Sequence, residues 1–172
     1  MGGLPPVGEI PHGTPAPVFS LPVSGGGGLM AGLPPVGARG LTLVAFFKDT
    51  CPTCRLAFPL LERIHRKVGS AGGRVVGISQ DGPEGAAAFA TELGLTFPIL
   101  IDGPDYPVSR LYGLVAVPSL FLVDAGGRIL VSGAGFARAE LQAMADDLAR
   151  SVEAPAFALY EASESFPAFK PG

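Results

Sequence analysis

The chain carries its only two cysteines in one C-x-x-C motif, Cys51 to Cys54. An apolar run at residues 41–47 predicts a buried strand before the motif, and an apolar stripe predicts a helix over residues 52–69 after it. The motif therefore falls at a strand-to-helix junction. Unpaired N–H groups and the helix dipole at such a junction favour a negatively charged sulfur. A cysteine pair placed in this way is typical of redox chemistry.

The rest of the chain alternates strand and helix patterns and closes with a hairpin and a last helix. Strands are predicted over 74–79 and 98–101, helices over 82–93 and 106–112, the hairpin over 119–131 and the last helix over 138–150. This order indicates an α/β sandwich with a mixed central sheet.

Composition divides the chain into three predicted segments. Residues 1–16 are rich in glycine and proline and are expected to form an extended arm, and residues 17–150 form the α/β domain. Residues 151–172 form a tail with several aromatic residues. These aromatic residues are expected to pack on the domain itself or on a partner.

Charge and hydropathy restrict the partners and the compartment. With a net charge of −3 and no run of lysine or arginine, the chain lacks the basic field that holds nucleic acid or anionic lipid. No apolar run is long enough to span a membrane, and no signal peptide is evident. We therefore expect a cytoplasmic protein, or an exported one if a leader has been removed. In a reducing compartment, a C-x-x-C motif is more often catalytic or metal-binding than structural.

The two cysteines are predicted to have different roles. Cys51 is expected to be exposed at the helix start and to attack a substrate, and Cys54, one turn inside the helix, is expected to resolve the mixed disulfide. Pro52 suits the first helical turn and stiffens the loop. A zinc site would need further ligands, and the chain offers only His12 and His65, both far from the motif. Redox exchange is therefore favoured over zinc binding, and over a structural disulfide, which would constrain little across two residues.

A second feature is Val117-Pro118-Ser119, where a proline opens a predicted strand. One interpretation is a proline at the start of an edge strand. The other is a cis peptide bond between Val117 and Pro118, which would place a turn of backbone beside the two sulfurs. Backbone groups in such a turn would be able to pair with an extended substrate. The residues alone leave both interpretations open.

From about Pro17 to Arg150, the chain resembles thioredoxin-fold proteins of the TlpA-like group, within the alkyl hydroperoxide reductase/thiol-specific antioxidant (AhpC/TSA) superfamily. The resemblance rests on motifs in the family's order and spacing, at residues 16–21, 43–47, 51–55, 58–59, 76–79, 94–98, 112–113 and 117–124. It implies a thioredoxin-like three-layer sandwich, with a central mixed β-sheet flanked by helices. It also implies thiol–disulfide exchange with Cys51 as nucleophile and Cys54 as resolver, and it makes Pro118 the family's cis-proline.

Three positions depart from the family pattern. Thr50 stands where relatives usually carry a tryptophan just before the first cysteine. Ala45 and Ala57 stand where thioredoxin and many TlpA-like proteins, respectively, carry an acid that moves a proton to or from the inner thiol. The inner thiol is therefore left without an evident general base. Lys48 and Asp49, the nearest charged residues, are candidate modulators together with Thr50, or else ordinary surface charges.

Two further functions stay open from the sequence. In a peroxiredoxin alignment that uses Lys48-Asp49, Cys54 takes the peroxidatic position, but Phe47 and Cys51 replace the proline and threonine that shape the peroxide pocket. The other alternative is a redox-inert interaction module, which only the aromatic tail suggests.

We therefore predict an enzyme that exchanges dithiol for disulfide with protein or small-molecule substrates and is recharged by a thioredoxin-type dithiol donor. Pro52, Thr53, Val117 and Pro118 are predicted to dock the substrate. No metal or organic cofactor is expected, since the cysteine pair itself carries the electrons.

Overall fold

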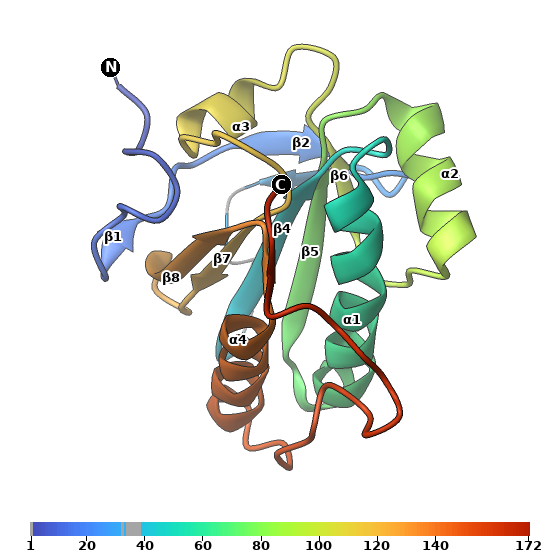
Figure 1. The fold of residues 1–172 in the computed structure, drawn as a ribbon. Helices are drawn as coiled ribbons and strands as arrows, with labels where there is room; N and C mark the ends of the chain where they lie inside the picture. The colour runs from blue at the N-terminus through green and yellow to red at the C-terminus, as the bar shows by residue number, and fades with distance from the viewer. Residues whose placement is uncertain (1, 32, 34–38) are drawn as a thin grey trace.

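The computed structural model describes residues 2–31, 33 and 39–172. Six strands form one sheet in the order β1-β8-β7-β4-β5-β6 (Figure 1). Their bounds are β1 Thr14–Pro15, β4 Thr42–Phe47, β5 Arg74–Ser79, β6 Ile99–Ile101, β7 Ser119–Val123 and β8 Arg128–Ala134. Because β4 runs parallel to β5 and antiparallel to β7, the sheet is mixed around its central strand.

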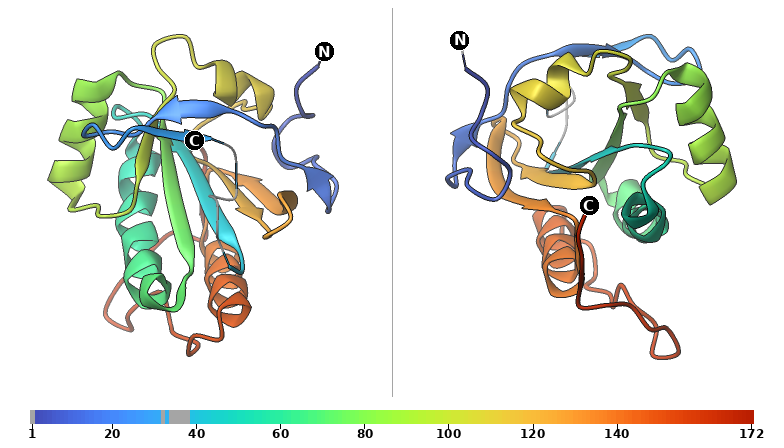
Figure 2. Two further views of the ribbon diagram at one scale, coloured as in Figure 1. Left: turned by 180° about the vertical axis from the view of Figure 1, so that it is seen from behind. Right: turned by 45° about the horizontal axis from the view of Figure 1, so that its top comes forward.

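Helices cover one face of the sheet, and a hairpin with a short helix covers the other (Figure 2). The first layer holds α1 Pro52–Val68, α2 Pro83–Leu93 and α4 Arg138–Ser151, and the 3₁₀ turn η1 Gly69–Ala71 follows α1. The second layer holds the hairpin of β2 Ser20–Pro22 with β3 Leu29–Ala31, and α3 Pro107–Leu111. The predicted sandwich with a central mixed β-sheet flanked by helices is therefore confirmed.

β4 lies between the two layers and leads into the cysteine motif. All its residues are buried, as expected for a central strand that is covered on both faces. Leu43 and Phe47 pack in the core beneath the helices, whereas Val44 and Phe46 pack in the core on the other face. The chain leaves β4 at Phe47 and enters α1 at Pro52, so the motif lies at the carboxyl end of the central strand.

The predicted elements appear where expected, and their ends differ by a few residues. The helix predicted to reach residue 69 ends at Val68, and the short helix predicted over 106–112 spans Pro107–Leu111. β8 continues beyond the predicted hairpin end because it pairs with β7 as far as Ser119↔Ala134. No helix in the part of the chain described here is both long enough and apolar enough to cross a membrane.

Both terminal segments lie against the domain. At the N-terminal side, β1 pairs antiparallel with β8, Val7 is buried, and the Leu4 N–H donates to the Leu111 carbonyl oxygen at 2.9 Å. In the tail, Leu159 is buried in the core beneath the helices. The tail then passes α1 and runs back toward the cysteine motif (Figure 1), where β10 Phe169–Lys170 pairs with β9 Phe136–Ala137.

Candidate active site

Cys51 is the N-cap residue of α1, and its sulfur takes part in the cap. The backbone at Cys51 is extended (φ −85°, ψ 111°), and Pro52 opens the helix as predicted. The Cys54 N–H donates a hydrogen bond to Cys51 Sγ at 3.0 Å, in the way that a hydroxyl or carboxylate oxygen caps a helix. The partly positive end of α1 therefore faces this sulfur.

The two sulfurs differ in their surroundings. Both cysteines carry free thiols, and Cys54 is fully buried. Burial raises the pKa of the Cys54 thiol well above its ordinary value, and a hydrogen bond with Cys51 raises it further. Cys51 is also buried, with 9% of its surface exposed, so the expectation of an exposed first thiol is wrong. Its sulfur is partly covered because the Val117 carbonyl oxygen lies 3.3 Å away.

β7 brings Val117 and Pro118 beside the motif. Because β7 pairs with β4 up to Phe46↔Ser119, the residues before Ser119 lie at the same sheet edge as the loop that follows β4. The Val117–Pro118 peptide bond is cis, which agrees with the second interpretation of this segment. The Cys51 thiol donates its hydrogen bond to the Val117 carbonyl oxygen. The loop before β7 therefore forms one wall of the surroundings of the outer thiol.

A cavity of about 520 Å³ opens beside Cys51. Three segments line it: residues 48 and 50–53 of the motif loop, residues 115–117 of the loop before β7, and residues 170–172 of the tail. Most of the predicted site residues therefore share one cavity, whereas Cys54, Asp49 and Pro118 lie outside its lining. Thr53 is buried, and its hydroxyl donates to the Pro171 carbonyl oxygen of the tail at 2.6 Å.

Asp49 is held by a residue that the sequence analysis missed. The Asp49 N–H donates to Asp81 Oδ2 at 2.7 Å, and Arg55 Nε donates to the Asp49 carbonyl oxygen at 2.9 Å. Burial raises the pKa of Asp81, and the neighbouring Asp49 carboxylate adds to this effect, although the Asp49 N–H opposes it. Asp81 follows β5, the parallel neighbour of β4, so both segments leave the sheet at one edge. The contact therefore depends on the order of the strands in the sheet, which the sequence patterns did not specify.

The two positions where relatives carry an acid lie deep in the core. Ala45 and Ala57 are fully buried, next to the inner thiol in the same hydrophobic cluster. Among the described residues, the buried carboxylates are Glu62, which binds Thr96, and Asp102, which caps α3. Both carboxylates are therefore engaged elsewhere. No group of three or more metal-ligating side chains occurs within the described ranges.

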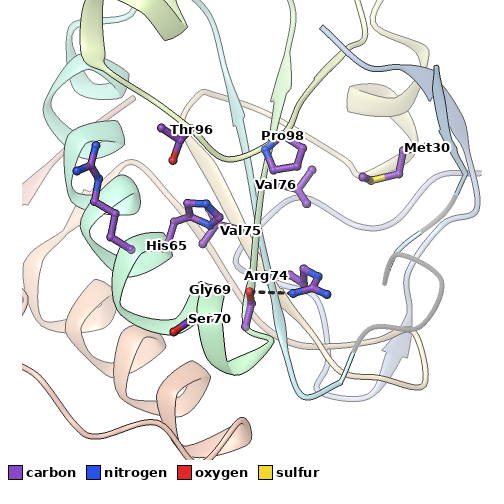
Figure 3. A pocket seen from close by; sticks show the side chains of 11 residues that line it. Met30, His65, Gly69, Ser70, Arg74, Val75, Val76, Thr96 and Pro98 are labelled. Atoms are coloured by element: carbon purple, nitrogen blue, oxygen red, sulfur yellow. Dashed lines mark hydrogen bonds between the residues drawn. The ribbon is translucent and has the colours of Figure 1, made fainter. Parts of the chain in front are cut away.

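A second cavity, of about 540 Å³, lies at the other end of α1 (Figure 3). Met30, His65, Arg74 and Thr96 are among its lining residues. His65 Nδ1 is buried and has no hydrogen-bond partner among the residues described, while the imidazole ring packs against Phe97 at a centroid distance of 5.9 Å. None of the predicted site residues lines this cavity. We therefore place the candidate active site at the cavity beside Cys51.

Comparisons with known proteins agree with this site. A family model described as the AhpC/TSA family matches residues 12–132. A Paracoccus denitrificans protein named as a thiol:disulfide interchange protein DsbE homolog is 38% identical over 97 residues, which are 56% of this chain and 51% of that protein. The chain thus spans about half the length of this relative. A Mycobacterium tuberculosis protein named as a peroxiredoxin is 33% identical over 139 residues, which are 72% of this chain and 85% of that protein.

Solved structures give the fold. A crystal structure described as a thiol:disulfide interchange protein DsbE from Chlorobium tepidum matches with a TM-score of 0.71 at 25% identity, over 83% of this chain and 98% of that chain. The molecule is therefore a thioredoxin-fold protein of the TlpA-like kind. The chain belongs to the AhpC/TSA family. Relatives named for thiol–disulfide exchange, together with the Cys51–Cys54 pair, support oxidoreductase chemistry.

Proposed function

We propose that the protein is a thiol–disulfide oxidoreductase that reduces disulfides in other proteins through Cys51 and Cys54. The observation that carries this proposal is the ordering of the two thiols. Cys51 Sγ accepts an N–H of the α1 N-terminus and borders the cavity, whereas Cys54 is buried behind it. An outer nucleophile with an inner resolver is the arrangement that two-step exchange needs.

The proposed exchange moves two electrons from the cysteine pair to the substrate. In the first step, the Cys51 thiolate attacks one sulfur of a substrate disulfide, that S–S bond breaks, and the departing substrate sulfur takes up a proton. In the second step, Cys54 loses its proton and attacks Cys51 Sγ. The mixed disulfide then breaks, the substrate leaves as a dithiol, and the pair becomes a disulfide. We propose that a thioredoxin-type dithiol returns the electrons, so that no metal or organic cofactor is needed.

The surroundings of Cys54 favour its deprotonation in the second step, after Cys51 has reacted. Part of the rise in its pKa comes from the hydrogen bond with Cys51 and from the charge of that sulfur. Once Cys51 is in a mixed disulfide, it can no longer carry that charge, so the Cys54 thiol becomes easier to deprotonate. We propose that Lys48 and Asp49, on the loop between β4 and α1, modulate this proton transfer together with water. An ammonium group favours the thiolate, and a carboxylate opposes it.

We propose that Pro52, Thr53, Val117 and Pro118 dock the substrate. Thr53 and Val117 both line the cavity beside Cys51, so a chain bound there would lie against both residues. We propose that the exchange runs in the reducing direction, as suits a reducing compartment.

Trapping the mixed disulfide tests the proposed roles of the two cysteines. Cys54→Ser removes the resolver, so an adduct with a peptide disulfide should accumulate on Cys51, and peptide mapping by mass spectrometry should locate it there. Cys51→Ser is the matched control and should form no adduct. An adduct on neither variant, or one on the remaining Cys54 of the control alone, would refute this assignment.

Peroxide reduction is the second candidate function, because the Mycobacterium relative carries a peroxiredoxin name. In that assignment, Cys54 would be the peroxidatic thiol. Its full burial and raised pKa argue against the reactive thiolate that such a role requires. We therefore expect slow peroxide consumption relative to reduction of insulin disulfides. The reverse ranking, measured on one preparation, would favour the peroxidase.

A further inference from the structure

Residues 167–172, called the strap below, cross the candidate active site as an extended segment (Figure 1). The strap begins where the Arg138 N–H donates to the Ala168 carbonyl oxygen at 2.9 Å. β10 then pairs antiparallel with β9, with Phe169 opposite Ala137. Pro171 follows, and its carbonyl oxygen accepts the Thr53 hydroxyl at 2.6 Å. Backbone groups therefore hold the strap from β9 to the first turn of α1.

The end of the strap lies against the atom that faces the outer thiol. A Cβ placed on Gly172 would overlap the Val117 carbonyl oxygen, which accepts the Cys51 thiol hydrogen bond. At Gly135, in the left-handed region (φ 77°), an added Cβ would lie 2.7 Å from the Lys170 carbonyl oxygen. The two glycines thus permit close backbone contact. A second chain could not occupy the same path while the strap is in place.

The strap is attached differently from the tail residues that precede it. Earlier in the tail, Leu159 is buried, and the Arg63 guanidinium donates to both oxygens of Glu164 at 2.7 and 2.6 Å. The residues of the strap are exposed, and Phe169 is 58% exposed. The strap therefore contributes little to the core, and it can leave the site while the preceding tail stays attached.

We propose that the strap is a built-in competitor for protein substrates, which must displace it to reach Cys51. This inference rests on the proposed exchange function and adds a condition for access to it. An extended polypeptide that bears a disulfide would take the place of the strap, pairing with β9 and passing Thr53 and Val117. Backbone pairing tolerates many side chains. A small disulfide needs no pairing with β9, so the strap restrains it less.

Two variants remove the strap from the site, and a third variant serves as their control. A deletion of residues 167–172 removes the bond to the Arg138 N–H, the pairing with β9 and the bond to Thr53. Gly172→Val keeps the full chain but sets a side chain against the Val117 carbonyl group. Gly2→Val makes the same change at a glycine with no neighbouring atom within 4 Å of the added Cβ.

The kinetic test compares reduction of insulin with reduction of hydroxyethyl disulfide. We expect the deletion to lower the KM for insulin about three- to tenfold, with Gly172→Val changing it in the same direction and kcat nearly constant. The rate on hydroxyethyl disulfide should stay within about twofold, since this substrate competes little with the strap. An unchanged KM for insulin in both variants, or equal changes for both substrates, would overturn the proposal.

A binding test separates this inference from the exchange function. In a Cys51→Ser/Cys54→Ser background, a fluorescent peptide with the sequence of residues 167–172 should bind the deletion variant and bind the full chain more weakly. Equal binding to both proteins, or binding to neither, would refute the strap as a competitor. Failure of wild type and variants to reduce either disulfide would instead refute the exchange function. The binding result would still show whether the strap competes for the site.

Discussion

Helix α1 carries two buried ionisable groups, one in its first turn and one near its middle, and the two groups are held in opposite ways. Cys54, in the first turn, has a raised pKa because burial and the Cys51 hydrogen bond act in the same direction. Glu62, two turns further along, is 6% exposed. Burial raises the pKa of Glu62, but hydrogen bonds from Thr96 and Arg66 outweigh that effect and lower it below its ordinary value.

The difference between these two groups shows that burial alone does not identify a reactive group. The Glu62 oxygens are bound by the Thr96 N–H at 2.9 Å, the Thr96 hydroxyl at 2.6 Å and Arg66 Nε at 3.0 Å. These bonds favour the charged form and hold it in place, so Glu62 serves the structure. The main side-chain partner of Cys54 is the other sulfur of the reacting pair. A reaction at Cys51 therefore changes the state of Cys54.

The largest expected effect is the loss of exchange when the outer sulfur is removed. Cys51→Ser replaces a good nucleophile with a hydroxyl that has no adjacent base, so insulin reduction should fall by about 10³-fold or more. Glu62→Gln, about two turns further along the helix, should keep the rate within about threefold, because this side chain contacts only structural partners. The insulin turbidity assay measures both variants. Comparable losses of activity in the two variants would remove the functional distinction between Cys51 and Glu62.

This contrast also shows what the sequence could predict. The cysteine motif, β4 and α1 are local patterns, because apolar spacing and helix-start residues act within a few positions. The contact of Asp81 with the Asp49 N–H depends on two strands ending at one edge, which appears only once the sheet order is known. The strap was harder still to predict. β10 has two residues and pairs through its backbone, which leaves no periodic pattern in the sequence.

A smaller effect is expected on stability when Glu62 is truncated. Glu62→Ala removes the acceptor for the Thr96 N–H and hydroxyl, but Thr96 is exposed, so water can replace part of the lost bonding. We expect the free energy of unfolding to fall by about 1 kcal/mol. Arg66→Ala should change it by only about 0.3 kcal/mol, since that side chain is 67% exposed. Urea unfolding measures both variants, and a larger loss for Arg66→Ala would contradict this account of Glu62.

The remaining expected effects are slopes of stability against pH, and they should have opposite signs for Cys54 and Glu62. The Cys54 thiol is harder to deprotonate in the folded protein, so its contribution is present below its ordinary pKa of 9.0 and is lost as pH rises beyond it. Glu62 is harder to protonate in the folded protein, so its contribution is present above its ordinary pKa of 4.5 and is lost as pH falls through the folded value. One proton gives at most about 1.4 kcal/mol per pH unit.

Difference measurements isolate the two slopes from all other titrating groups. The first comparison is between Cys51→Ser and Cys51→Ser/Cys54→Ser, under reducing conditions from about pH 8 to about pH 10. Neither protein has the outer thiol, so its titration does not contribute to the difference. The single variant should lose stability relative to the double variant as pH rises. In the second comparison, the free energy of unfolding of wild type should fall relative to that of Glu62→Gln as pH decreases below about 4.5. If the alkaline difference were flat, the inner thiol would titrate alike in the folded and unfolded chains, and the argument that it stays protonated until Cys51 reacts would fail.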